Sequence, residues 1–174
     1  MIRIGLALIV AAALTVAVAY TAPSSEQTDG DTAPIFGIKI PAGYRDWRLI
    51  SVAHEEGSLN DLRAILGNDI AIKAFREGTY PFPDGTIIAR LAWDYVPLAE
   101  SAQAFGQLQS FVAGPPKNGV QFMVKDSKKY ASTSGWGFAH FNDGKPADET
   151  VHKTCFACHK VAKARDLVFN RYAR

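Results

Sequence analysis

The sequence of 174 residues predicts an α+β domain, mainly an antiparallel β-sheet with appended helices. Two observations carry this prediction. Apolar residues alternate or form β-branched runs between short polar turns through most of the chain, which is typical of strands. Helical composition is concentrated late, at residues 147–165, and the sequence does not supply the four long amphipathic helices of a helical bundle.

The first elements follow from local apolar patterns. We expect a strand at 46–54, in which Trp47, Leu49 and Ala53 share a face. After a polar turn, residues 62–66 fit either a short strand or a helical turn. The sequence therefore predicts strand structure at the start of the domain.

A helix and further strands are expected next. Residues 69–77 have the spacing of an amphipathic helix that ends at Gly78. Strands are then expected at 86–96, 105–113, 120–125 and 135–141. Asn118-Gly119 predicts a hairpin connection between the middle two of these.

The first 19 residues predict a secretory signal peptide. Arg3 gives a short positive region, residues 4–19 are an uncharged apolar run, and Ala17-Val18-Ala19 has the small-x-small pattern of a cleavage site. We therefore expect export to the periplasm and cleavage after Ala19. An uncleaved N-terminal membrane anchor is the alternative, although the run is shorter than the roughly 20 residues that a membrane span needs.

The rest of the chain divides into a short segment and one domain. Residues 20–32 are rich in Ser, Thr, Asp and Pro, which is typical of a flexible tether, and residues 33–174 form a single domain. The formal net charge is +2, and the Lys and Arg residues are spread along the chain. Because nucleic-acid binding calls for a clustered basic face, we expect no nucleic-acid partner.

The motif Cys155-Phe156-Ala157-Cys158-His159 is the strongest functional signal in the chain. C-x-x-C-H is the signature of c-type haem attachment. On a helix, the two thiols lie on one side of a turn, and His159 emerges on nearly the same face as Cys155. We therefore expect one haem c, attached covalently through Cys155 and Cys158, with His159 as the ligand of its iron.

The two cysteines could also serve a redox pair or a zinc site. A thioredoxin-type redox pair needs no histidine after the second cysteine and follows an early strand, whereas this motif lies near the C-terminus. A zinc site needs two more ligands, and His152 is the only candidate nearby. Haem c in bacteria is attached outside the cytoplasmic membrane, so the motif and the signal peptide predict each other.

A series of short motifs, in a fixed order from residue 44 to residue 172, resembles the cytochrome P-460 family, which is similar to the β-sheet cytochromes c′ known as c′-beta. The motifs are Tyr44-Arg45-Asp46-Trp47, Phe82-Pro-Asp-Gly-Thr86, Val124-Lys125-Asp126-Ser127, Gly135-Trp136-Gly137-Phe138, the haem motif and Phe169-x-Arg171-Tyr172.

The resemblance implies a mainly antiparallel β fold, a homodimer, a proximal His159 and a distal side of the haem that is open to small molecules. In the enzymatic branch of the family, periplasmic proteins oxidise hydroxylamine. The c′-beta branch binds gases such as nitric oxide.

One position departs from the enzymatic branch. There a lysine, a few residues after the Asp-Gly-Thr turn, bonds covalently to a porphyrin meso carbon. The corresponding residue here is Arg90, and no lysine occurs between Lys73 and Lys117. A guanidinium stays protonated near neutral pH, so we expect no such cross-link. The enzymatic branch also has a distal carboxylate near the Trp-x-Phe stretch, where this chain has Ala131-Ser-Thr-Ser134.

Several side chains are candidates for the haem pocket. On a strand, Trp136, Phe138 and His140 project to one face, and the first two either pack in the core or form an aromatic wall of the haem site that keeps its distal side dry and narrow. His140 and Met123 are alternative sixth ligands of the iron. Arg90 either lies in solvent or pairs with a haem propionate or a distal ligand.

Three functions remain open at this level. The first is an open haem site that binds a small diatomic or nitrogenous ligand such as nitric oxide. The second is a hydroxylamine-oxidising enzyme, and the third is a periplasmic electron carrier with a partner cytochrome. The replacement of lysine by Arg90 favours the first over the second.

Overall fold

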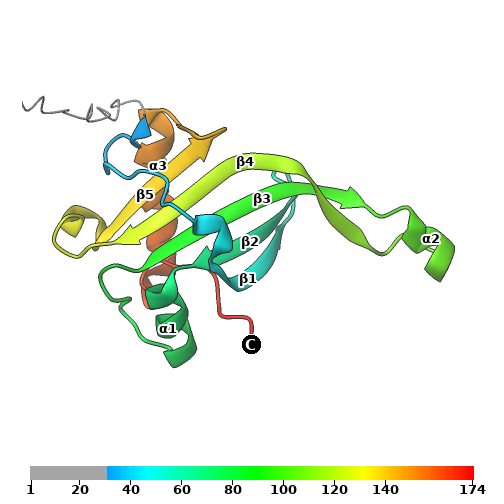
Figure 1. Ribbon diagram of the computed structural model, residues 1–174, viewed down its shortest axis with the longest axis horizontal. Helices are drawn as coiled ribbons and strands as arrows, with labels where there is room; N and C mark the ends of the chain where they lie inside the picture. Colours follow the sequence, from blue (N-terminus) through cyan, green and yellow to red (C-terminus); the bar gives the residue numbers. More distant parts are fainter. Residues whose placement is uncertain (1–30) are drawn as a thin grey trace, which may run out of the picture.

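The computed structural model describes residues 31–174 (Figure 1). The predicted signal peptide and most of the predicted tether lie outside the described residues. Six strands form one antiparallel sheet whose spatial order is their order in the chain, which confirms the predicted fold class. The strands are β1 (Arg48–Glu55), β2 (Asp61–Gly67), β3 (Ile87–Pro97), β4 (Phe111–Lys125), β5 (Trp136–Asn142) and β6 (Lys145–Pro146).

The helices begin and end at capping residues that the sequence supplies. Helix α1 (Asp69–Glu77) confirms the predicted helix: the Asn68 side chain accepts from the Ala71 N–H at 3.0 Å, and Gly78 ends the helix with φ of 67°. Helix α3 (Glu149–His159) begins at Asp148, whose carboxylate accepts from the Val151 N–H. A 3-10 helix, Lys160–Arg165, follows α3, and a short helix α2 (Glu100–Phe105) lies between β3 and β4. No helix in residues 31–174 combines the length and the apolar character that a membrane crossing requires.

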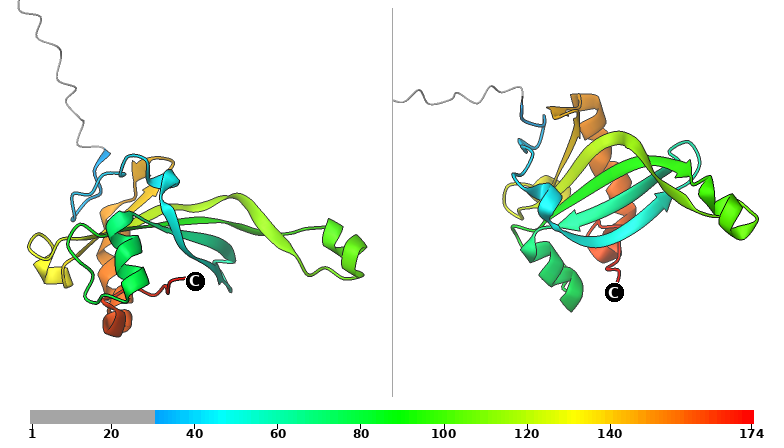
Figure 2. Two further views of the ribbon diagram at one scale, coloured as in Figure 1. Left: turned by 60° about the horizontal axis from the view of Figure 1, so that its bottom comes forward. Right: turned by 45° about the vertical axis from the view of Figure 1, so that its right-hand side comes forward.

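The two faces of the sheet are covered by different segments. Figure 2 (left) shows α1, α3 and the C-terminal segment beneath the sheet, and the segment that precedes β1 above it. On the upper face, the Tyr44 ring packs against Phe122 at 5.1 Å, and the Tyr130 hydroxyl donates to the Phe36 carbonyl. On the lower face, Phe138 of β5 packs against Phe156 of α3. The C-terminal segment reaches β1, where the Ala173 N–H donates to the Ile50 carbonyl.

The strand register decides which side chains share the lower face. Directly paired residues on neighbouring strands project to the same side of a sheet. One such row is Ile65, Arg90, Gln121 and His140, and the next is Ile88, Met123 and Phe138. The sheet thus brings residues from four strands together opposite α3.

Strands β3 and β4 continue beyond the other strands as a two-stranded arm with α2 at its tip (Figures 1 and 2). The predicted hairpin connection at residues 114–119 is wrong, because β4 runs through them and the link between the strands is residues 98–110. Asn118 and Gly119 do have positive φ, 53° each. They lie where the register of β3 against β4 shifts. The left-handed backbone conformation of these two residues therefore forms a β-bulge within β4 and not a hairpin turn.

Candidate functional site

Helix α3 carries all three residues of the haem motif. Cys155 and Cys158 are free thiols three positions apart on the helix. Cys155 is partly buried against the core, whereas Cys158 is exposed. Burial raises the pKa of the Cys155 thiol, and the neighbouring Cys158 contributes in the same direction. The helix therefore places one sulfur against the core and the other one turn further along, near the surface.

His159 ends α3 and is held in one tautomer. Its Nδ1 lies 2.7 Å from the Leu167 carbonyl oxygen. Because a carbonyl only accepts, Nδ1 carries the proton and Nε2 is left as the unprotonated nitrogen, which is the arrangement of a histidine that ligates a metal. Burial lowers the pKa of His159, against the opposing effect of the Leu167 hydrogen bond. The ring packs between Phe138 at 5.0 Å and Phe169 at 5.1 Å.

The Leu167 carbonyl is positioned by a buried ion pair. Asp166 and Leu167 both have positive φ, 49° and 68°. The Asp166 carboxylate accepts from Lys125 Nζ at 2.8 Å and from the Phe82 N–H at 2.9 Å. The Lys125 and Asp166 side chains are only 6% and 12% exposed. This pair ties the segment after α3 to the end of β4, and so fixes the acceptor of His159.

A cavity of about 350 Å³ separates His159 from the lower face of the sheet. This volume is within the range of cofactor and small-molecule sites. On the helical side the cavity is lined by His159 and by Val168, Phe169 and Asn170 of the C-terminal segment. On the other side its walls come from strands β1 to β4, namely Ala53, Glu55, Arg63, Ile65, Ile88, Arg90, Gln121, Phe122 and Met123.

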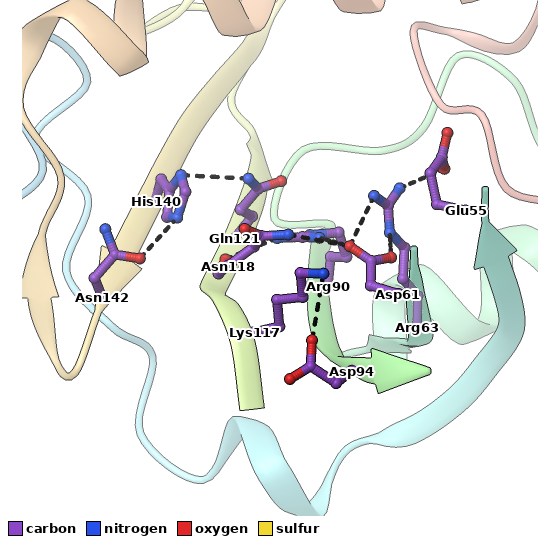
Figure 3. Close-up of polar contacts among 10 residues, drawn as sticks. All are labelled: Glu55, Asp61, Arg63, Arg90, Asp94, Lys117, Asn118, Gln121, His140 and Asn142. Carbon is purple, nitrogen blue, oxygen red and sulfur yellow. Dashed lines mark hydrogen bonds and ion pairs between the residues drawn. The ribbon is translucent and has the colours of Figure 1, made fainter. Parts of the chain in front are cut away.

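Arg63 and two carboxylates form a network in this wall (Figure 3). Arg63 Nε donates to Asp61 Oδ1 at 2.6 Å, and Nη1 donates to Glu55 Oε2 at 2.7 Å. Asp61 is completely buried. Burial alone would raise the pKa of Asp61, but hydrogen bonds from Arg63 and Asn118 and the charge of Arg63 outweigh it, so the pKa lies below its ordinary value. Asp61 is therefore ionised at neutral pH.

Arg90 lies beside this network and lines the cavity. Its Nη2 donates to the Asn118 carbonyl at 2.9 Å, and its Nη1 lies 3.9 Å from Asp61 Oδ2. The Nε is buried and has no partner among the described residues. Burial lowers the pKa of Arg90 to about 10, with the charge of Arg63 acting in the same direction. Arg90 thus remains protonated near neutral pH, as the sequence argument requires.

The other predicted pocket residues take different positions. Trp136 is completely buried, packs against Phe82 at 5.7 Å and does not line the cavity. Phe138 packs against the His159 ring and is not among the residues that line the cavity. His140 is also outside the cavity lining, and its ring nitrogens lie 3.3 Å from Gln121 Nε2 and 3.2 Å from Asn142 Oδ1 (Figure 3). Met123, by contrast, does line the cavity.

Sequence reasoning did not anticipate several parts of this site. It missed Arg63, Glu55, Gln121 and the pair of Lys125 with Asp166, and it did not identify the Leu167 carbonyl. None of these has a local signal, because each becomes part of the site through strand register or through contacts between distant segments. The positive φ at Asp166 and Leu167 falls on residues that are not glycine, so composition does not reveal it either.

Comparison with protein families agrees with this geometry. A model of the cytochrome P460 family matches residues 41–170, which includes the whole sheet and the haem motif. The chain belongs to the cytochrome P460 family. Membership makes it a haem c cytochrome and confirms the resemblance that the motifs indicated. No curated protein matches the sequence.

The residues of this cytochrome P460 fit a haem c. His159 offers an unprotonated Nε2 at a cavity whose walls include Ile65, Ile88 and Met123. The buried Arg90 Nε, which has no partner in residues 31–174, suits a cofactor that carries carboxylates. Both nitrogens of His152 are engaged, Nδ1 with the Asp148 carbonyl and Nε2 with the His140 N–H, so His152 is not available to the alternative zinc site.

Proposed function

We propose that this cytochrome is a mono-haem c protein that binds nitric oxide or a similar small nitrogen species at an open distal site. In this proposal Cys155 and Cys158 would hold the haem through thioether bonds, and His159 Nε2 would be the one protein ligand of its iron. The observation that carries it is the hydrogen bond from His159 Nδ1 to the Leu167 carbonyl, because it fixes the tautomer that a proximal ligand needs.

The haem, when bound, would supply an iron atom able to take a small diatomic ligand. The protein residues have separate tasks. Leu167, held by Asp166 and Lys125, keeps the His159 ring in place. Ile65, Ile88 and Met123 give the cavity apolar walls that limit access of water.

Hydroxylamine oxidation is the second candidate, and one observation favours it. Glu55 lines the cavity, so a carboxylate is present there after all. It is paired with Arg63 at 2.7 Å, however, and Arg90 takes the place of the lysine that the enzymatic branch uses. A paired carboxylate is a weaker proton acceptor than a free one, since the guanidinium stabilises its ionised form.

An electron carrier is the third candidate. Met123 lines the cavity and is the side chain in its wall that would serve as a thioether ligand of the iron. Met123 pairs directly with Ile88 and Phe138 in a packed row of the sheet, where it also suits simple core packing. Binding of nitric oxide without displacement of a protein ligand would distinguish the first function from this one.

We further propose that the protein is exported to the periplasm and acts as a homodimer. The apolar run and small-x-small site at the N-terminus support export. Exposed apolar side chains on and beside the β3–β4 arm support a second copy as partner: Val52, Phe105, Leu108, Phe111 and Val112. A partner cytochrome remains part of the electron-carrier alternative.

An anaerobic titration of the ferrous protein with nitric oxide tests the main proposal. We expect a saturable change of the absorption spectrum at micromolar protein, and little hydroxylamine-dependent reduction of an added electron acceptor. Rapid turnover of hydroxylamine would instead establish the enzymatic function. Failure of nitric oxide to bind, together with a spectrum that shows two protein ligands, would establish the electron carrier.

A further inference from the structure

The two arginines in the cavity wall differ in how fully their donors are used (Figure 3). Arg63 donates from Nε and Nη2 to the two oxygens of Asp61, at 2.6 and 3.3 Å, and from Nη1 to Glu55 at 2.7 Å. All three of its nitrogens therefore have carboxylate partners. Three of its five N–H groups are thus directed at carboxylates, and Asp61 and Glu55 compensate its charge, so Arg63 is a weaker candidate than Arg90 for binding a ligand.

Arg90 has fewer partners. Within residues 31–174 its only hydrogen bond is from Nη2 to the Asn118 carbonyl, which is neutral. Its Nε has no partner among the described residues, although the side chain is only 13% exposed. Leaving a guanidinium N–H buried without an acceptor is costly, so the position calls for an acceptor that the part of the chain described by the structure does not provide.

Asp61 is not that acceptor. Its Oδ1 is taken by Arg63, and its Oδ2 accepts from Arg63 Nη2 and from Asn118 Nδ2 at 3.1 Å. Arg90 Nη1 stays 3.9 Å away, beyond hydrogen-bond distance. Asp61 and the Asn118 carbonyl thus hold the Arg90 guanidinium in place without satisfying its Nε.

We propose that Arg90 binds a planar oxyanion of the carboxylate type in the cavity. A guanidinium fork matches two coplanar oxygens, and a charge-assisted hydrogen bond is about twice as strong as a neutral one. Two sources supply this chemistry: a propionate of the haem, or a small free oxyanion such as nitrite at the distal side. The proposal rests on the proposed function only in so far as both need a haem in this cavity.

The test compares the full-length holoprotein with Arg90→Gln. Arg48→Gln is the matched control, because Arg48 pairs with Asp69 on the exposed surface and does not line the cavity. The readouts are the propionate bending band in the resonance Raman spectrum and the nitrite affinity of the ferric protein.

If a propionate is the partner, Arg90→Gln shifts the propionate band and leaves the nitrite affinity within twofold. If a free oxyanion is the partner, the nitrite affinity falls roughly 10- to 100-fold, the effect of one charge-assisted hydrogen bond, and the propionate band stays in place. Either result, or both together, supports the proposal. No change in either readout relative to Arg48→Gln overturns it.

A second measurement covers the case in which Arg90→Gln does not fold. A crystal structure of the wild-type holoprotein, with and without nitrite, should place a propionate or nitrite oxygen within hydrogen-bond distance of Arg90 Nε. An Nε that meets only water or apolar atoms in both crystals contradicts the proposal. These outcomes do not depend on nitric oxide binding, so the proposal and the proposed function can fail separately.

Discussion

Individual residues around the cavity divide into those that the chain satisfies internally and those that it leaves for a ligand. His159 Nδ1, Arg63 and Asp61 all have protein partners. Among the described residues, Arg90 Nε is buried without a partner, and the hydrogen bond of His159 is made by Nδ1 and leaves Nε2 free. Polar groups at a buried site are normally paired, so these two atoms are where we propose that the haem and its ligand contact the protein.

Covalent attachment is the first property to check at this scale. If Cys155 and Cys158 both form thioether bonds, the denatured protein keeps its haem through acid-acetone extraction. The variant in which both cysteines are replaced by Ala should release its haem under the same conditions. Free extraction from the wild type would show that the motif is not used for attachment.

Asp61 should be the carboxylate on which the network depends most. Asp61→Asn removes the charge that compensates Arg63 and Arg90 in a buried setting, so we expect the free energy of unfolding to fall by about 3 kcal/mol. Glu55→Gln is the matched control, because the Glu55 side chain is 47% exposed and its loss should cost at most about 1 kcal/mol. Equal effects in urea denaturation would contradict this ranking.

The same residue gives the pH dependence of stability. The pKa of Asp61 in the folded protein lies below its ordinary value of 3.8. Ionised Asp61 therefore contributes stability that is fully present above pH 3.8 and is lost as the pH falls through the lower folded pKa. The difference in free energy of unfolding between the wild type and Asp61→Asn should therefore shrink as the pH falls through that acid range, which urea denaturation at several pH values measures. A difference that stays constant across the range would contradict the lowered pKa of Asp61.

Among the elements, the contact between the end of β4 and the segment after α3 matters most for the site. The buried pair of Lys125 and Asp166 makes this contact and positions the Leu167 carbonyl. Lys125→Met should lower the free energy of unfolding by about 3 to 5 kcal/mol, since it leaves the Asp166 charge buried without a partner. Lys73→Met, which breaks the exposed pair with Glu77, should cost about 0.5 kcal/mol or less.

Spectroscopy separates positioning of His159 from mere support of the fold. In Lys125→Met the iron–histidine stretching band of the ferrous protein should shift, because the acceptor of His159 Nδ1 is no longer held. Asp166→Asn keeps an oxygen for the Phe82 N–H and should shift the band less. A band that stays unchanged in both variants would assign the ion pair a structural role only.

Elements with a strong local signal could be predicted from the sequence, and the register between them could not. Helix α1 follows from its spacing and from Gly78, and β5 from its alternation. The Asn118-Gly119 pair was misleading because a left-handed pair serves a bulge as well as a hairpin turn. Likewise, the haem motif identifies His159, but only the pairing of β2, β3 and β4 brings Arg63, Arg90 and Gln121 into one wall.

For the whole molecule, the projecting arm predicts a homodimer. Val52 and Val112 are 70% and 41% exposed on the β1 and β4 strands, and Phe105 at the tip of the arm is 60% exposed. Apolar surface of this kind is commonly buried against a partner. Light scattering after gel filtration should give twice the mass of the mature, haem-bearing protomer.

Charged substitutions test whether the arm region holds the dimer together. Val52→Lys combined with Val112→Lys should shift the protein to the monomer. Val161→Lys should not, because Val161 is 82% exposed on the 3-10 helix after α3 and belongs neither to the arm nor to the sheet. A wild type that is monomeric at micromolar concentration would refute the homodimer.

The absorption spectrum of the purified ferrous protein is the most direct test of the central claim. It shows whether the iron has a single protein ligand and whether the porphyrin ring is free of any cross-link to the protein. With His159 as the only axial ligand and Arg90 in place of a cross-linking lysine, we expect the broad bands of an open high-spin c-type haem. Sharp α and β bands would show a second protein ligand, with Met123 in the cavity wall as the first candidate. A strongly red-shifted Soret band would show a cross-link between the protein and the porphyrin ring, and would contradict the account of Arg90.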